Sequence, residues 1–245
     1  MMKQTVVIVG GGIVGGLSAL GLHKRFRVVL LEQRPILKIM GTSTSKMLVM
    51  NPKSIEILNG FGFNTFESQC SITEVHVSLM NSTTISRLKA KDYGRAYLGQ
   101  NIATHDMEQA IYRRLEGTDV LCLDDVQDIQ LQKRPKGWQL DFKQKGLSKT
   151  EEVDFIIASD GQNSDIREQL NIPSKVCGAH HKACVCLVEV DNPHHIAHER
   201  FTENGALALL PMNHHKMTLV WSLPNESTAL MALDDEAFMA TLKQT

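Results

Sequence analysis

Three glycines near the start of the chain have the spacing of a phosphate-binding turn. Gly10, Gly12 and Gly15 follow an unbroken apolar run, Thr5–Val9, which predicts a buried parallel strand. In such a fingerprint the first glycine allows a sharp turn and the second lets backbone approach a pyrophosphate. The third lets the following helix pack closely on the strand. The spacing therefore predicts an adenine-dinucleotide site.

An acidic residue stands where such sites bind the ribose. The next strand is predicted at Arg27–Leu31, which is apolar from Val28 onward, and Glu32 directly follows it. A carboxylate at this place accepts hydrogen bonds from ribose hydroxyls and repels a 2′-phosphate. Glu32 alone does not separate NAD from FAD. Arg34 either reaches an adenosine phosphate or ribose, or lies in solvent.

Two other interpretations of this stretch compete with the dinucleotide site. Lys3 before an apolar run is also typical of a secretory signal peptide, but consecutive glycines would break its helix and no small-residue cleavage site stands out. The second competing interpretation is a glycine-rich turn that binds no ligand. The strand, helix, second strand and acid around the glycines favour the dinucleotide site.

Composition excludes several function classes. The 245 residues suffice for one large or two small domains, and a net charge of −1 leaves no electrostatic footprint for nucleic acid. No apolar run reaches the length of a spanning helix, which favours a cytoplasmic protein. The odd number of cysteines, 5 without a CxxC pair, fits reduced thiols in the cytosol.

The histidines raise the question of a metal site, because several stand close together in sequence. The groups are His180 with His181, His194 with His195 and His198, and His214 with His215. Adjacent side chains on a strand point apart, and no carboxylates stand at ligand spacing. Nearby Pro and Asn are typical of loops. We therefore expect solvated loop histidines and no metal.

Hydrophobic patterns predict an α/β chain with two kinds of sheet. Alternation predicts an antiparallel hairpin over 72–88, with its turn at 81–82, and a β-meander over 126–141. Short parallel strands are expected at 119–121 and 153–158. Helices are expected to begin at Asn51–Pro52 and to span 106–116 and 235–242. Further strands are predicted at 183–190, 207–210 and 217–223.

A second motif, Ser-Asp-Gly-x-Asn-Ser-x-x-Arg at 159–167, follows the strand at 153–158. With the glycine fingerprint it resembles the FAD-dependent aromatic hydroxylases, the p-hydroxybenzoate hydroxylase-like class. Residues 199–212 and 219–222 look like the ubiquinone-biosynthesis branch, closest to its 2-octaprenyl-6-methoxyphenol hydroxylases. The resemblance covers nearly all of the chain. The resemblance assigns Gly10, Gly12, Gly15, Glu32, Asp160, Gly161 and Arg167 to FAD binding. Arg34 and Lys46 are added as further candidates for contact with FAD.

The resemblance also implies a fold. It predicts a Rossmann-type FAD-binding domain, a parallel sheet plus a β-meander, formed by residues 1–71 and 101–173. A mostly antiparallel β substrate domain, residues 72–100 and 174–245, is inserted into it. Leu209, Pro211 and Met217 are expected either to line the substrate pocket or to be ordinary core. No residue stands out as a catalytic base.

The activity implied by the resemblance is hydroxylation of a polyprenyl-phenol in ubiquinone biosynthesis. FAD reduced by NAD(P)H would react with O2 to a C4a-hydroperoxide that hydroxylates the ring. The polyprenyl tail implies peripheral contact with the inner membrane. The resemblance leaves open a ubiquinone-biosynthesis complex or a homo-oligomer as the assembly.

The chain departs from the family in two places. Lys46 stands where the family usually has an arginine that approaches the flavin, and lysine lacks the planar fork for bidentate contact. The family also continues for well over a hundred residues and carries a Gly-Asp turn there, so the sequence is expected to be a truncated piece.

Two rival functions remain from the sequence. An NAD-dependent dehydrogenase would use the glycine fingerprint but gives no reason for the motif at Asp160. A non-catalytic nucleotide-binding or assembly module fits a piece that lacks the C-terminal part of the family.

Overall fold

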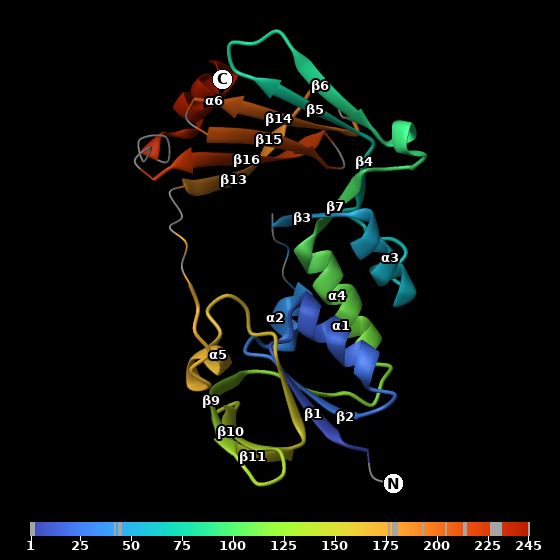
Figure 1. Ribbon diagram of the computed structural model, residues 1–245, viewed down its shortest axis with the longest axis vertical. Coiled ribbons are helices and arrows are strands. Elements are labelled where there is room, and N and C mark those ends of the chain that lie inside the picture. The colour runs from blue at the N-terminus through green and yellow to red at the C-terminus, as the bar shows by residue number, and fades with distance from the viewer. Residues whose placement is uncertain are drawn as a thin grey trace. The chain divides into compact units, whose positions relative to one another are not determined.

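The computed structural model describes residues 3–41, 43, 46–175, 177, 181–192, 194–203, 205–212, 215–225 and 232–244. Its contacts divide the chain into two compact units (Figure 1). The first comprises Met1–Thr44, Asn59–Asn64 and Thr104–Lys175, and the second comprises Ser45–Leu58, Thr65–Ala103 and Val176–Thr245.

These boundaries differ from the predicted ones mainly at residues 45–58 and 65–71, which we expected in the nucleotide domain. They belong to the second unit because strands β3 (Met47–Met50) and β4 (Cys70–Ile72) both pair with β7 (Gly99–Ala103). The roles of the two units, one for FAD and one for substrate, stay a prediction.

A four-stranded parallel sheet forms the centre of the first unit. Its order is β12-β1-β2-β8, from Phe155–Ala158, Thr5–Val9, Arg27–Leu31 and Leu121–Leu123. The predicted strand at 119–121 therefore lies two residues further along the chain. Helices α1 (Ile13–Leu22) and α4 (Thr104–Leu115) contact each other above the sheet in Figure 1. Gly16 of α1 permits this, because a β-carbon there would overlap Ile111 of α4.

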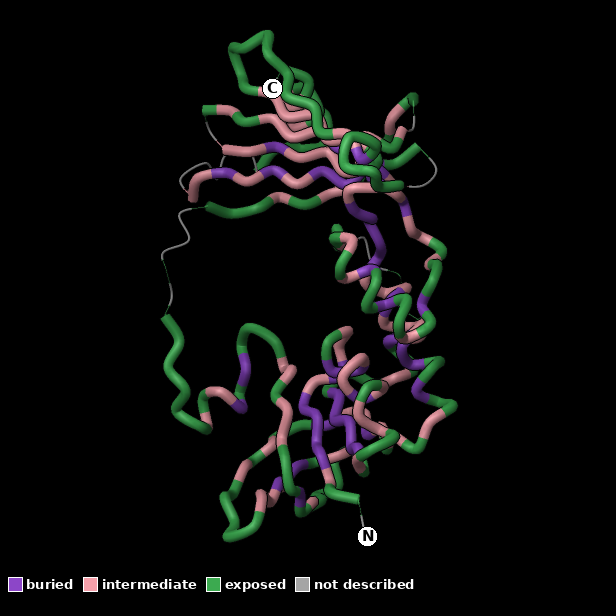
Figure 2. The backbone as a smooth tube through the Cα atoms, turned by 45° about the vertical axis from the view of Figure 1, so that its right-hand side comes forward, coloured by how far each residue is buried: buried purple, intermediate pink, exposed green. Residues whose placement is uncertain are grey.

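The predicted meander is present and one strand longer than expected. Strands β9 (Val126–Lys133), β10 (Trp138–Gln144) and β11 (Leu147–Val153) form an antiparallel sheet in the order β11-β10-β9. One face of the parallel sheet packs on it, through the alternate residues Val7, Val9, Val29 and Leu31. This explains the apolar runs, since Val6 and Ile8 of β1 and Val28 and Leu30 of β2 are buried as well (Figure 2).

A six-stranded sheet dominates the second unit, in the order β13-β16-β15-β14-β5-β6. The strands are β13 (His181–Glu189), β16 (Lys216–Pro224), β15 (Gly205–Pro211), β14 (Ile196–Thr202), β5 (Glu74–Leu79) and β6 (Ile85–Lys89). The hairpin β5–β6 is as predicted, and all neighbours are antiparallel except β14 and β5. Helix α6 (Asp235–Gln244) packs Phe238 on Trp221, with ring centroids 6.0 Å apart.

The expectation that the clustered histidines lie in loops is wrong for His181, the first residue of β13, and for His198. His198 lies on β14, a strand that the sequence pattern did not indicate, and its ring stacks edge-on against His76 and His194. The strand was missed because polar residues interrupt its alternation, while its neighbours β5 and β15 supply the pairing. His180 and His214 lie outside the described residues.

Three shorter helices complete the described elements: α2 (Ile36–Gly41), α3 (Pro52–Gly60) and α5 (Asp165–Gln169), with a 3-10 turn at Ala90–Tyr93. The predicted start of α3 is confirmed, because the side chain of Asn51 accepts a hydrogen bond from the N–H of Ser54 at 2.9 Å. No helix in the described part of the chain is long and apolar enough to cross a membrane.

Candidate functional site

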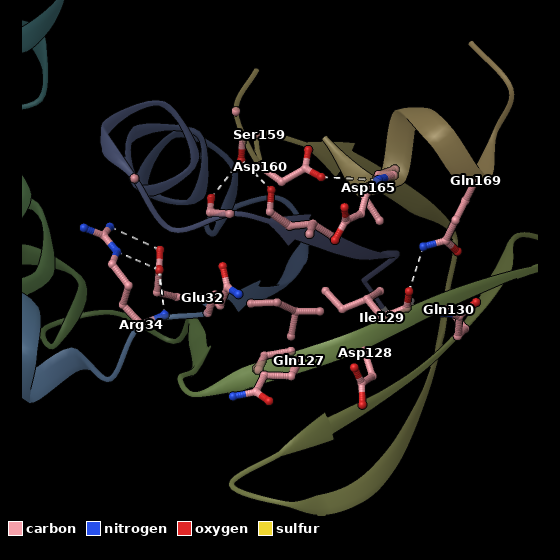
Figure 3. A pocket seen from close by; sticks show the side chains of 18 of the residues that line it. Glu32, Arg34, Gln127, Asp128, Ile129, Gln130, Ser159, Asp160, Asp165 and Gln169 are labelled. Carbon is pink, nitrogen blue, oxygen red and sulfur yellow. Dashed lines mark hydrogen bonds and ion pairs between the residues drawn. The ribbon is translucent and has the colours of Figure 1, made fainter. Parts of the chain in front are cut away.

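A cavity of about 770 Å³ opens at the carboxyl ends of β12, β1 and β2, within the first unit. Its walls come from the glycine turn after β1, the segment after β2, the first half of β9, and the turn after β12 with α5 (Figure 3). Ligands of open parallel sheets bind at this edge. Of the residues that the sequence assigned to the cofactor, the cavity brings together Gly10, Gly12, Glu32, Arg34, Asp160 and Gly161.

The three fingerprint glycines differ in what a side chain would meet at each position. Gly10 has a φ of +96°, which L side chains rarely adopt, and a β-carbon there would press on Ser159 backbone. A β-carbon at Gly15 would overlap the carbonyl oxygen of Gly10 and lie 2.6 Å from the hydroxyl of Ser159. At Gly12 the nearest atom to such a β-carbon is 4.0 Å away, so the missing side chain leaves open space beside the cavity.

Glu32 holds both the glycine turn and Arg34. One of its carboxylate oxygens accepts a hydrogen bond from the N–H of Gly11 at 2.9 Å, and the other contacts Nε of Arg34 at 2.9 Å. The guanidinium of Arg34 also pairs with Glu108 of α4, again at 2.9 Å. The hydrogen bond to Glu108 and the nearby Glu32 raise the pKa of Arg34, against the opposing effect of burial. Two carboxylates therefore hold the guanidinium of Arg34, and this side chain is not free in solvent.

Two residues of α4 that no sequence motif indicated complete the contacts around Gly11 and Arg34. Glu108 pairs with Arg34, and the hydroxyl of Tyr112 donates a hydrogen bond to the carbonyl oxygen of Gly11 at 3.0 Å. Tyr112 is buried, and burial followed by the charge of Glu32 raises its pKa. A spacing of four residues puts both side chains on one helix face, and that spacing was the available signal.

The second motif is built around the turn after β12. Gly161 has a φ of +91°, so the Asp-Gly turn needs its glycine. The carboxylate of Asp160 accepts a hydrogen bond from the N–H of Ile166 at 3.3 Å, and Ser164 caps α5 by accepting from the N–H of Arg167 at 3.0 Å. The turn therefore presents Asp160 at the cavity in a fixed position (Figure 3).

The charge of the lining is mostly negative. Carboxylates come from Glu32, Asp128, Asp160, Asp165 and Glu168, and Arg34 is the only cation among the described residues that line the cavity. A diphosphate in this cavity would find few side-chain cations. Backbone N–H groups, at the turn and at the start of α1, are the available partners for an anion.

Three of the residues predicted to contact the cofactor, Gly15, Lys46 and Arg167, do not line this cavity. The guanidinium of Arg167 donates to the carbonyl oxygen of Gln162 at 2.8 Å and so braces the turn. Lys46 is exposed and belongs to the second unit. Contact of either residue with a cofactor stays a prediction, as does that of Gly15.

The three expected substrate-lining residues lie on one face of the six-stranded sheet. Leu209 packs against the Trp221 cluster, and Pro211 and Met217 are buried opposite each other on neighbouring strands. The other face of the same sheet exposes Val185, Leu187 and Phe201. Whether the predicted three touch a substrate stays a prediction.

Within the described ranges, no three His, Cys, Asp or Glu side chains are grouped so that they could hold a metal ion. The stacked histidines include His76, whose ring nitrogen contacts Glu74 at 2.8 Å.

Comparison with known proteins agrees with this geometry. The profile of a family described as "FAD binding domain" matches residues 3–243. The ubiquinone biosynthesis monooxygenase COQ6 of Drosophila melanogaster is 24% identical over 260 residues, which cover 98% of this chain and 54% of that protein. The 3-demethoxyubiquinol 3-hydroxylase of Escherichia coli is 24% identical and covers 88% of this chain and 56% of its own length. The chain thus spans about half the length of the curated relatives it matches.

Solved structures share the fold. A p-nitrophenol 4-monooxygenase from Pseudomonas putida superposes with a TM-score of 0.77 at 14% identity, over 98% of this chain and 61% of that one. The flavin-dependent monooxygenase PieE, solved with FAD and substrate, gives 0.77 at 17% identity over 99% of this chain and 46% of its own.

Proposed function

Because this chain belongs to the FAD-binding domain family, we propose that the cavity of its first unit holds the FAD of a monooxygenase that hydroxylates a polyprenyl-phenol in ubiquinone biosynthesis. The electron donor in this proposal is NAD(P)H and the oxidant is O2. The observation that carries it is that two turns distant in sequence, at Gly10–Gly12 and Ser159–Gly161, line one cavity.

The residues present fit the adenosine and diphosphate parts of FAD. The space at Gly12 admits a diphosphate against backbone, and the start of α1 offers N–H groups with a positive dipole end. Glu32 is placed to accept hydrogen bonds from ribose hydroxyls in exchange for part of its contact with Arg34. Asp160 lines the same cavity and would contact FAD there.

When bound, FAD would supply the electron transfer and oxygen activation that no side chain can perform. The protein would position the cofactor and the phenol ring and exclude water. The relatives named above support ubiquinone biosynthesis as the context, and a polyprenyl tail would bring the whole protein into peripheral contact with a membrane.

Titration of the purified chain with FAD, followed by flavin fluorescence, tests the cofactor assignment. We expect saturable binding that Glu32→Gln weakens, because the neutral amide is a poorer acceptor for ribose hydroxyls. Glu116→Gln, which changes an exposed residue of the same type, is the matched control. Retention of NAD without FAD would favour a dehydrogenase, and a folded chain that binds neither would favour an assembly module.

The hydroxylation itself is tested with isotopically labelled O2, NAD(P)H and a polyprenylated phenol. We expect one labelled oxygen atom in the phenol product, detected by mass spectrometry. FAD binding with NAD(P)H oxidation but no labelled product would contradict the substrate class and leave the cofactor assignment intact.

A further inference from the structure

The glycine turn is held by hydrogen bonds from several elements around it. The N–H of Gly10 donates to Leu31, and its carbonyl oxygen accepts from the hydroxyl of Ser159. The N–H of Gly11 donates to Glu32, and its carbonyl oxygen accepts from Tyr112. Two of these partners lie outside the strand–helix–strand unit that contains the fingerprint: Ser159 follows β12, and Tyr112 lies on α4.

The hydrogen bond from Tyr112 fixes the orientation of one peptide plane. The carbonyl oxygen of Gly11 and the N–H of Gly12 belong to the same peptide group, and in a trans peptide they point in opposite directions. Tyr112 holds the carbonyl edge of this plane from α4 and is not among the residues that line the cavity. Gly12 is one of the residues that line the cavity, and its N–H is directed away from Tyr112.

From this geometry we propose that Tyr112 is a positioning residue for diphosphate binding, which it serves by aiming the N–H of Gly12 into the cofactor cavity. The proposal rests on the proposed function, because it assumes that the cavity takes a dinucleotide. It assigns to α4 a role in recognition that the fingerprint does not include.

Three properties of Tyr112 suit this role. Its ring is buried, so its position is fixed by packing and not by solvent. Burial raises the pKa of its hydroxyl, which therefore keeps its proton and remains a donor. A β-carbon at Gly11 would overlap this hydroxyl, so the close approach of Tyr112 requires the glycine.

The charge of the cavity makes the orientation of backbone donors important. Carboxylates prevail in the lining, and Arg34 is shared between Glu32 and Glu108. Backbone N–H groups must then supply much of the attraction for a diphosphate. A peptide that is free to rotate would present its N–H to the ligand only part of the time.

Tyr112→Phe tests the proposal because it removes the hydroxyl and keeps the buried ring. We expect FAD and ADP to bind about three- to tenfold more weakly, as for the loss of one hydrogen bond. Adenosine, which has no phosphate, should bind the variant as tightly as it binds the unchanged protein. This dependence on the diphosphate is a readout that a general loss of stability would not produce.

Ile111→Val is the matched control, since it trims the neighbouring buried residue of α4 without touching Gly11. It should lower the melting temperature and leave the ratio of ADP to adenosine affinity unchanged. If Tyr112→Phe leaves ADP binding intact, or weakens adenosine and ADP equally, the positioning role is wrong. If the unchanged protein binds neither FAD nor ADP, the proposed function fails instead.

Discussion

The hydroxyl of Ser159 lies 2.8 Å from the carbonyl oxygen of Gly10 and donates a hydrogen bond to it. This contact joins the turn after β12 to the turn after β1, which are adjacent strands of the parallel sheet. The N–H of Ser159 also donates to Val9 at 2.7 Å, so the two turns are fixed to each other through backbone and side chain. A ligand that spans both turns therefore meets a preformed surface.

The same contact leaves no room for a side chain at Gly15. We expect Gly15→Ala to destabilise the fold by about 3 kcal/mol, because the added methyl group meets the backbone of Gly10 and neither strand nor helix can move freely. The free energy of unfolding, from urea denaturation, measures this. A variant as stable as the unchanged protein would show that α1 shifts readily on β1.

Gly12→Ala should behave differently, which makes the two variants a matched pair. The new methyl group meets nothing closer than 4.0 Å, so stability should change by about 1 kcal/mol or less. FAD affinity should fall at least about tenfold, because the methyl group occupies the space proposed for the diphosphate. Equal FAD affinity, measured by fluorescence titration, would count against this placement of the phosphates.

The cap of α5 gives a prediction on stability alone. Ser164→Ala removes the acceptor for the N–H of Arg167 and should cost about 1 kcal/mol of unfolding free energy. The cost reaches the core because Ile166, in the first turn of this short helix, is buried in the cluster under the parallel sheet. Ser148→Ala, at an exposed position on β11, is the control and should be near neutral.

The stacked histidines predict a loss of stability in mild acid. Burial, followed by the charges of His194 and His76, lowers the pKa of His198 from its ordinary value of 6.5. The folded protein then binds this proton more weakly than the unfolded chain, so its stability decreases as the pH falls below about 6.5. Glu74 and Lys89 also face the cluster, and they remain in every variant.

His198→Gln should reduce that loss, which is measured as the shift of the urea midpoint between pH 7.5 and pH 5. His181→Gln, at an exposed position of β13, should lose stability as the unchanged protein does. The same acid-induced shift in His198→Gln and in the unchanged protein would mean that other groups cause it.

Sequence patterns predicted the elements whose neighbours are close along the chain. The hairpin β5–β6 and the pair β9–β10 alternate clearly, and Asn51–Pro52 defined the start of α3 through local chemistry. The fingerprint was predicted because the spacing of its glycines between a strand and a helix is recognisable within one short stretch of sequence. Strands β3, β4 and β7 were missed because pairing with distant segments, and not their own composition, makes them strands, whereas β14 was missed because polar residues interrupt its alternation.

The residues of the site that belong to local motifs were predicted from the sequence, and the residues that tertiary contacts bring to the site were not. Gly10, Glu32 and Asp160 belong to motifs that can be read from spacing. Tyr112 has no motif, because its contact with Gly11 depends on how α4 crosses α1. The ion pair between Glu108 and Arg34 could not be predicted either, because it forms only where α4 and the end of β2 meet in space.

The parallel pairing of β5 with β14 has a consequence for synthesis on the ribosome. The hairpin β5–β6 is complete once Lys89 has emerged, but its partner β14 is not available until residues 90–195 have been translated. During that interval one edge of β5 offers unpaired N–H and C=O groups to other nascent chains. Newly made protein should therefore depend on chaperones until β14 has been synthesised, although the hairpin β5–β6 is complete earlier. Slowing translation over this interval should increase the fraction of the protein that aggregates.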